Sequence, residues 1–269
     1  MAQVRLPLAP QEGFGSTSRS DAWWAQPLIV LVALSSMLTY LTWALLQGEY
    51  FEFGNYLSPV YSPVLWGDSQ HAWFGPGAPP FWPSFLAYSP AMIALVFPGG
   101  FRVTCYYYRG AYYKAFWGAP PACGVAGPHK KYTGERAFPL IVQNLHRYFM
   151  YGAVAYVPIL TYDAWHALWF ADPASGVQHF GIGVGTLVIT LNTTLLTLYL
   201  LSCHSWRHAI GGFKDILSRD PVRRTVYEAS TKLNCHHQRY AWISLVWVAF
   251  TDFYIRMCAM GVFTDFRIV

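Results

Sequence analysis

The chain has 269 residues, of which 54% are apolar, 18% are aromatic and only 12% are charged. An ordinary soluble domain carries roughly 25% charged residues, so this composition excludes a protein whose whole surface faces water. The formal charge of +5 does not indicate nucleic-acid binding, because the basic residues lie in loops between apolar segments.

Five apolar segments are long enough to cross a bilayer, which takes roughly 20 residues. Pro90 and Pro98 interrupt the second segment and predict a kink, where neighbouring helices must satisfy the freed backbone groups. Gly181, Gly183 and Gly185, near the start of the fourth, permit close approach of another helix. The sequence thus predicts an all-α integral membrane protein, a five-transmembrane-helix bundle in one domain over residues 1–269. The expected spans are residues 27–46, 82–101, 138–169, 180–203 and 240–263.

The basic residues lie almost entirely on one side of this bundle. Sixteen of the 18 belong to the N-terminal arm or to the connections 102–137 and 204–239 with the helix ends beside them. The positive-inside rule therefore predicts a multi-pass protein of the cell (cytoplasmic) membrane, with a cytoplasmic N-terminus and an external C-terminus. On the outer side, residues 48–81 would form a cap, and the short link 171–178 predicts that the third and fourth spans are antiparallel neighbours.

The first cytoplasmic loop alternates aromatic and basic residues, as FRVTCYYYRGAYYKAFWGAPPACG from Phe101 to Gly124. One interpretation is an interfacial aromatic belt whose cations bind lipid headgroups. The other is a docking platform, because aromatic residues and arginine are enriched in the cores of protein interfaces. The candidate docking residues are Arg102, Tyr106, Tyr107, Tyr108, Arg109, Lys114 and Trp117.

Polar residues also gather at the cytoplasmic ends of the third, fourth and fifth spans. A quinone site needs an apolar slot, one or two hydrogen-bonding groups for the carbonyl oxygens and a proton path to water. These helix ends supply such groups, although ordinary helix-end polarity would look similar. The candidate quinone-binding residues are His146, Arg147, His204, Ser205, Trp206, His208, His237 and Arg239.

A haem with two histidine ligands is the competing interpretation of these histidines. It needs imidazoles from two helices at matching depth, such as His146 with His204, or His166 with His179. Because the first two spans contain no histidine and most candidates lie at helix ends, haem b is not favoured, and neither is any other metal.

The fifth span carries two opposite charges, Asp252 and Arg256, spaced to share one helix face. Ionisable residues in a membrane helix usually mark a function or a partner. A self-neutralising pair is expected here as a structural ion pair in preference to a proton path. The sequence contains no nucleotide-binding loop, iron–sulfur spacing or metalloprotease motif, and no catalytic residue is predicted.

Three stretches carry a resemblance to a known family: TCYYYRGAYYKAFWGAPPAC, CHSWRH and WISLVWVAFTDFYIRM. From about residue 80 onward, the chain resembles the membrane-anchor subunit of succinate dehydrogenase (succinate:quinone oxidoreductase), in the actinobacterial form with a single five-helix anchor. The resemblance implies that the chain docks an iron–sulfur subunit, with a flavoprotein subunit beyond it. Those partners would hold the iron–sulfur clusters and FAD, and electrons from succinate would reduce menaquinone or ubiquinone at the anchor.

Five-helix anchors with two haems take ligands from their first four helices, whereas the first two spans of this chain offer none. The resemblance therefore implies a haem-free anchor. Two alternatives stay open: a haem b-binding cytochrome subunit of another quinone-linked dehydrogenase, and a non-redox membrane scaffold or transporter.

Overall fold

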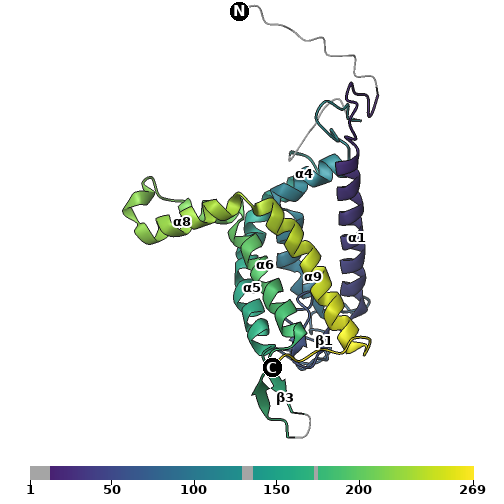
Figure 1. Cartoon of the computed structure of the whole chain (residues 1–269), viewed down its shortest axis with the longest axis vertical. Helices are drawn as coiled ribbons and strands as arrows, with labels where there is room; N and C mark the ends of the chain where they lie inside the picture. The colour runs from purple at the N-terminus through teal and green to yellow at the C-terminus, as the bar shows by residue number, and fades with distance from the viewer. Residues whose placement is uncertain (1–12, 129–135, 173–174) are drawn as a thin grey trace, which may run out of the picture. The chain divides into compact units, whose positions relative to one another are not determined.

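The computed structural model describes residues 13–128, 136–172 and 175–269 (Figure 1). Three of the basic residues assigned to the cytoplasmic side, Arg5, Lys130 and Lys131, lie outside the described residues. The chain divides into one unit of Met1–Ser36 with Arg102–Leu145 and a second of Met37–Phe101 with His146–Val269.

Three long helices form the centre of the second unit: α5 (His146–His166), α6 (Val184–Leu201) and α9 (His237–Ala259). α6 packs against both of the others (Figure 1). The Thr193 hydroxyl of α6 donates to the Leu160 carbonyl of α5 (3.1 Å), and the Trp247 indole of α9 donates to the Val188 carbonyl of α6 (3.1 Å). Strands β3 (Trp169–Ala171) and β4 (Gln178–Phe180) form an antiparallel hairpin between α5 and α6, so these helices are antiparallel neighbours, as expected.

Among the described residues, three helices are long and apolar enough to cross a membrane: α1 (Ala25–Gln47), α6 and α9. Their bounds agree with the first, fourth and fifth expected spans to within a few residues. α5 lies inside the third expected span, residues 138–169, but is shorter at both ends. It contains Pro158 and follows a 3-10 helix, η2 (Leu140–Leu145).

The second expected span, residues 82–101, differs from the prediction. Its helical part starts only at Pro90 and is broken into α2 (Pro90–Ala94) and α3 (Val96–Val103). Pro90 starts a helix because a proline at the first helical position removes only an N–H that has no partner in the helix. Pro98 cannot donate to the carbonyl of Ala94, and the Tyr156 hydroxyl of α5 donates to that carbonyl instead (2.6 Å). A neighbouring helix thus satisfies the group that the proline frees.

Two glycines let α3 lie directly against α5. A Cβ atom at Gly100 would collide with the ring of Phe149, and one at Gly152 would collide with the ring of Phe97. Because Gly100 belongs to α3 and Gly152 to α5, each helix accommodates an aromatic ring of the other. Together with the Tyr156 bond, these contacts fix α2 and α3 along the first half of α5.

The segment after α1, residues 48–81, is the one for which the sequence predicts an outer cap, and it is called the cap below. It contains a short antiparallel pair, β1 (Glu52–Phe53) and β2 (Tyr56–Leu57). Its apolar side chains form a core of their own with the start of α2, made of Phe51, Leu57, Val60, Tyr61, Val64 and Ala91. Tyr56 belongs instead to a second core with residues of α5, α6 and α9.

The glycines near the start of α6 serve a different contact from the one expected. A Cβ at Gly185 would overlap the ring of Tyr56, and one at Gly183 would overlap the Asp265 carboxylate. One at Gly181 would lie 2.9 Å from the Val269 carbonyl. The close approach is therefore made by the cap and by the segment after α9, because loops and not another helix cover this end of α6.

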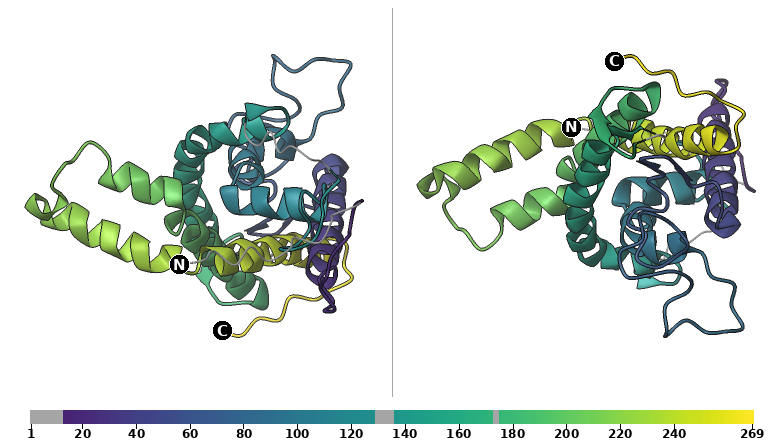
Figure 2. Two further views of the ribbon diagram at one scale, coloured as in Figure 1. Left: turned by 90° about the horizontal axis from the view of Figure 1, so that it is seen from above. Right: turned by 90° about the horizontal axis from the view of Figure 1, so that it is seen from below.

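The connection 204–239 is largely helical. α7 (His204–Gly211), the 3-10 helix η3 (Leu217–Arg219) and α8 (Pro221–Asn234) form a hairpin. α8 runs across the direction of α5 and α6, and the hairpin extends away from the helices of its unit (Figures 1 and 2). Arg223 closes the hairpin by donating to the carbonyls of Ile210 and Gly212, the second at 2.6 Å.

The first unit contains the start of α1, α4 (Tyr106–Ala115) and η2. The segment before α1 is hydrogen-bonded to the segment that follows α4. The backbones of Gly15 and Ser16 bond to Ala126 (2.9 Å each), and the Arg19 guanidinium donates to the Cys123 carbonyl (2.8 Å).

Candidate functional site

Aromatic rings form a continuous stack in the second unit, where α3 and α6 end and α5 and α9 begin. The rings of Phe101 and His146 are stacked at 4.7 Å and 12°. Phe101 contacts Tyr199 at 5.3 Å, and Tyr199 stacks on His237 at 5.1 Å and 14°. Phe101, His146 and Tyr199 are buried, and His237 is half-buried. The stack thus joins two histidines of the sequence prediction through two aromatic residues that the prediction did not include.

The Ser202 hydroxyl lies between the Tyr199 carbonyl and the ring of His237. It donates to the Tyr199 carbonyl (2.9 Å) and lies 2.8 Å from Nδ1 of His237. The Tyr199 carbonyl can only accept, whereas the direction of the contact between Ser202 and His237 depends on the tautomer of the imidazole. A histidine ring is the side chain best suited to proton transfer near neutral pH.

His146 is the most enclosed of the predicted histidines. Only 2% of its surface is exposed, and its Nε2 lies 3.2 Å from Sγ of Cys203. His204, which would be its partner in the disfavoured haem interpretation, lies on α7 and contacts His208, with 3.0 Å between the Nε2 atoms. Among the described residues, no group of three or more His, Cys, Asp or Glu side chains could hold a metal ion.

The other predicted quinone-binding residues lie outside the aromatic stack. His204, Ser205, Trp206 and His208 belong to α7, and Arg147 and Arg239 are exposed in the first turns of α5 and α9. The pKa of His204 lies below its usual value, first because of partial burial and then because of His208 and Arg207.

The two histidines of the alternative haem pair, His166 and His179, have different surroundings. The ring of His166, at the end of α5, lies 6.2 Å from that of His71 in the cap and 5.3 Å from Tyr162. His179 lies on β4, all three residues of which are exposed. His166 therefore meets the cap, a contact between residues distant in sequence that helix spacing alone could not predict.

The predicted docking residues centre on α4 in the first unit. Tyr108 is buried and accepts a hydrogen bond from Arg102 (3.0 Å), while the guanidinium of Arg109 lies 5.1 Å from the ring centre of Tyr106. Burial raises the pKa of Tyr108, so its hydroxyl stays protonated. Tyr107 packs on Tyr108 at 5.5 Å. Tyr106, Lys114 and Trp117 are exposed, so this segment presents aromatic and cationic surface on a partly buried base.

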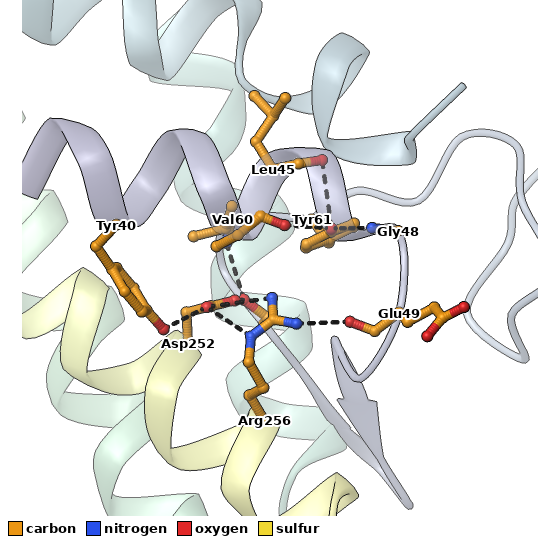
Figure 3. Close-up of polar contacts among 10 residues, drawn as sticks. Tyr40, Leu45, Gly48, Glu49, Val60, Tyr61, Asp252 and Arg256 are labelled. Atoms are coloured by element: carbon orange, nitrogen blue, oxygen red, sulfur yellow. Dashed lines mark hydrogen bonds and ion pairs between the residues drawn. The ribbon is translucent and has the colours of Figure 1, made fainter. Parts of the chain in front are cut away.

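Asp252 and Arg256 form a buried ion pair on α9 (Figure 3). Two guanidinium nitrogens lie 3.4 Å from Oδ2 of Asp252, and the same carboxylate accepts from Tyr40 (2.7 Å) and Ser58 (2.5 Å). Arg256 also donates to the Glu49 carbonyl (2.7 Å) and lies over the ring of Trp43. Each charge thus has several partners from α1 and the cap.

Comparisons with known proteins identify the family of the chain. The family model described as actinobacterial succinate dehydrogenase subunit SdhC matches residues 25–261. A chain of the solved Mycobacterium smegmatis Sdh1 complex in the apo form is 42% identical, with 94% of each chain covered and a TM-score of 0.82. No curated protein matches the chain. Since the family model spans most of its length, the chain belongs to the actinobacterial SdhC family, the membrane subunit of succinate dehydrogenase.

Proposed function

We propose that this membrane subunit docks the iron–sulfur and flavoprotein subunits on its cytoplasmic side and reduces quinone at the aromatic stack of His146, Phe101, Tyr199 and His237. The stack supports this proposal because it combines flat apolar rings with a histidine that can transfer a proton. A quinone needs that combination, since it is a flat ring whose two carbonyl oxygens take up protons on reduction.

The proposal includes five crossings of the cell membrane. α1, α6 and α9 have the length and apolar composition of spans. α5 is the proposed third crossing, because it packs along α6 and has 21 residues, about 31 Å of helix at 1.5 Å per residue. α2 and α3 would provide the second, continued on the outer side by the cap. The N-terminus would then be cytoplasmic and the C-terminus external, in keeping with the basic connections.

The α4 segment is the proposed contact for the iron–sulfur subunit. Exposed Tyr106, Lys114 and Trp117 offer the residue types that bury much area in an interface and still hydrogen-bond. Buried Tyr108, bonded to Arg102, would hold α4 in place beneath that surface. FAD and the iron–sulfur clusters would belong to the partner subunits.

We infer that the subunit works without haem b. An axial histidine needs its coordinating nitrogen directed at the iron, yet Nε2 of His146 lies against Cys203 and its ring is stacked on Phe101. His204 and His208 contact each other, and His166 contacts the cap. A reduced visible spectrum of the purified complex with a cytochrome b band would contradict this inference.

Substitution of the stack tests the quinone site. His237→Ala should lower quinone reduction by the purified complex roughly 10- to 100-fold, the usual effect of losing a proton-transfer group. Succinate oxidation by an artificial soluble acceptor should stay unchanged, because that reaction bypasses the membrane site. Tyr199→Phe, which keeps the ring and removes the hydroxyl, should lower quinone reduction to a smaller extent.

His236→Ala is the matched control, because His236 is the exposed neighbour of His237. It should leave both activities unchanged. Loss of both activities in His237→Ala would indicate failed assembly, which Tyr199→Phe would then separate from loss of the site. If His204→Ala lost quinone reduction while His237→Ala kept it, the site would lie on α7 and the proposal would fail.

A further inference from the structure

α8 carries an apolar stripe along one side. Val222, Val226, Ala229 and Leu233 follow the spacing of residues that share one face of a helix. Val222 and Val226 are 74% and 42% exposed, and Ala229 is exposed as well. The stripe therefore has apolar surface that the described part of the chain leaves open.

A second side of α8 faces the body of the protein. Tyr227 accepts hydrogen bonds from the Arg207 guanidinium of α7 (3.1 and 3.0 Å), and Ser230 donates to the Leu201 carbonyl at the end of α6 (2.9 Å). At 100° per residue, these two positions lie roughly a quarter turn from the apolar stripe. The axes of α7 and α8 define a plane. The stripe lies out of this plane, on one of the two faces of the hairpin, and does not point toward α7 or directly away from it.

The third side of α8 is polar. Arg224 pairs with Glu228 one turn later (2.7 Å), and Thr231 and Lys232 continue the same side. The helix therefore separates apolar from charged surface, with its α7-facing side between them. Such a helix is suited to a boundary between an apolar medium and water.

The hairpin tip extends the apolar surface. Phe213 is 107% exposed, and Ile216 is 48% exposed. Lys214 and Arg219 accompany them, and residues 204–239 contain seven basic against three acidic residues. An aromatic residue beside cations at an exposed tip is typical of a membrane interface with anionic headgroups.

The direction of the hairpin fits the same medium. α8 lies across the direction of α5, α6 and α9, near the ends where α5 and α9 begin, and extends beyond the helices of its unit (Figures 1 and 2). If α5, α6 and α9 cross the bilayer, a helix that lies across them at their ends runs along the membrane surface and extends over lipid.

We propose that the α7–α8 hairpin lies on the cytoplasmic leaflet, with the stripe Val222, Val226, Ala229 and Leu233 and the tip Phe213 in the acyl boundary and its basic residues on anionic lipid headgroups. This inference rests on the membrane orientation given under the proposed function. It assigns the hairpin a lipid partner, so the iron–sulfur subunit docks elsewhere on the cytoplasmic side.

Photocrosslinking in the complete succinate dehydrogenase complex tests the assignment. The photoreactive residue p-benzoylphenylalanine replaces Val226 on the stripe in one sample and Thr231 on the polar side in the matched control. The complexes are placed in nanodiscs of phosphatidylcholine with phosphatidylglycerol and irradiated, and intact-mass spectrometry identifies what has been attached. Position 226 should give a several-fold higher yield of phospholipid adduct than position 231.

Two results would overturn the proposal. Attachment of position 226 mainly to the iron–sulfur subunit or to a second copy of this chain would make the stripe a protein interface. Equal lipid yields at the two positions would show that the hairpin does not separate lipid from water. Succinate oxidation by a soluble acceptor, measured on both samples, confirms that each complex is assembled.

The lipid charge is tested separately. In nanodiscs of phosphatidylcholine alone, the yield at position 226 should fall several-fold, and equal yields in both lipid mixtures would overturn the assignment to anionic lipid. A failure of the proposed orientation is distinguishable, since a reversed protein would still crosslink to lipid at position 226 but would expose Cys235 to reagents outside the cell.

Discussion

Asp252 and Arg256 place two opposite charges, both buried, on one helix. Removal of one charge should therefore destabilise the protein more than removal of both. Asp252→Asn leaves the guanidinium of Arg256 in a buried place without its countercharge, and we expect a destabilisation of about 3–5 kcal/mol. The measurement is the temperature at which half of the purified complex loses succinate:quinone activity, which should fall well below that of the wild type.

The paired substitution Asp252→Leu with Arg256→Met is the control for charge compensation. Replacing a whole buried ion pair by apolar side chains of similar volume is often neutral for stability. The double variant should therefore recover much of the stability that Asp252→Asn loses. If the double variant were no more stable than the single variant, the instability of Asp252→Asn would not be due to an uncompensated charge.

His204 gives the molecule a titration that depends on its neighbours. Its folded-state pKa is lowered by burial, His208 and Arg207, so the unfolded chain binds the proton more readily. Stability from this group is present above the unfolded value of about 6.5 and is lost as the pH falls toward the folded value. On acidification from about pH 7 to pH 5, the thermal midpoint of the His204→Gln complex should fall by less than the thermal midpoint of the wild-type complex. An equal decrease would contradict the assignment.

At the level of residues, the sequence could have revealed more of the stack than the histidines. Tyr199 lies in the last turn of α6, Ser202 is its C-cap, and Cys203 follows directly, so their i, i+3, i+4 spacing indicates one side of this helix end beside His204. Phe101 offered no such signal, because its place on His146 depends on α3 packing against α5 through glycines far apart in sequence. Polar helix ends could be predicted, whereas their pairing required the tertiary contacts.

At the level of elements, the start of α6 depends on one absent side chain. Gly185→Ala would drive a Cβ into the ring of Tyr56, which bonds to Asp265 at 2.8 Å. Overpacking of this kind costs about 1–3 kcal/mol, so the thermal midpoint of the complex should fall. Gly99→Ala is the control, because a Cβ there meets only Leu95 at 3.8 Å and should stabilise the helix by about 0.5–1 kcal/mol. Equal midpoints for the two variants would contradict the close packing.

Apolar length and composition predicted α1, α6 and α9 well because each is a continuous helix of lipid-compatible residues. The same signal failed at residues 82–89, where the chain is irregular and mostly exposed, and Pro90 starts a helix in place of bending one. It also missed α7 and α8, because a polar connection can be helical when one face packs on the bundle.

For the whole molecule, the charge asymmetry makes an orientation prediction that needs no assay of activity. In inside-out membrane vesicles, a membrane-impermeant maleimide should label exposed Cys235, and in intact cells it should not. Ser175→Cys, in the exposed link between β3 and β4 and with Cys123 and Cys235 replaced by serine, should show the opposite pattern. Labelling of Cys235 from outside intact cells would contradict the predicted orientation.

An orientation could be predicted from the sequence because the positive-inside rule needs only the number of lysine and arginine residues in each connection. The arrangement of the cap could not be predicted in that way. Tyr61 bonds to the Ala44 carbonyl (2.6 Å) and Ser58 bonds to Asp252 (2.5 Å), which joins the cap to helices at opposite ends of the sequence.

The placement of both charges within α9 has a consequence for how the protein is made. α1 and the cap leave the ribosome before α9, so the Glu49 carbonyl and the hydroxyls of Tyr40 and Ser58 exist before their charged partners arrive. A lone charge at the centre of an inserting helix costs about 2.5–3.5 kcal/mol. Because Asp252 and Arg256 are one turn apart, they can neutralise each other during passage into the bilayer and then exchange part of that contact for the waiting partners. α9 can thereby enter the bilayer without carrying an isolated charge through lipid.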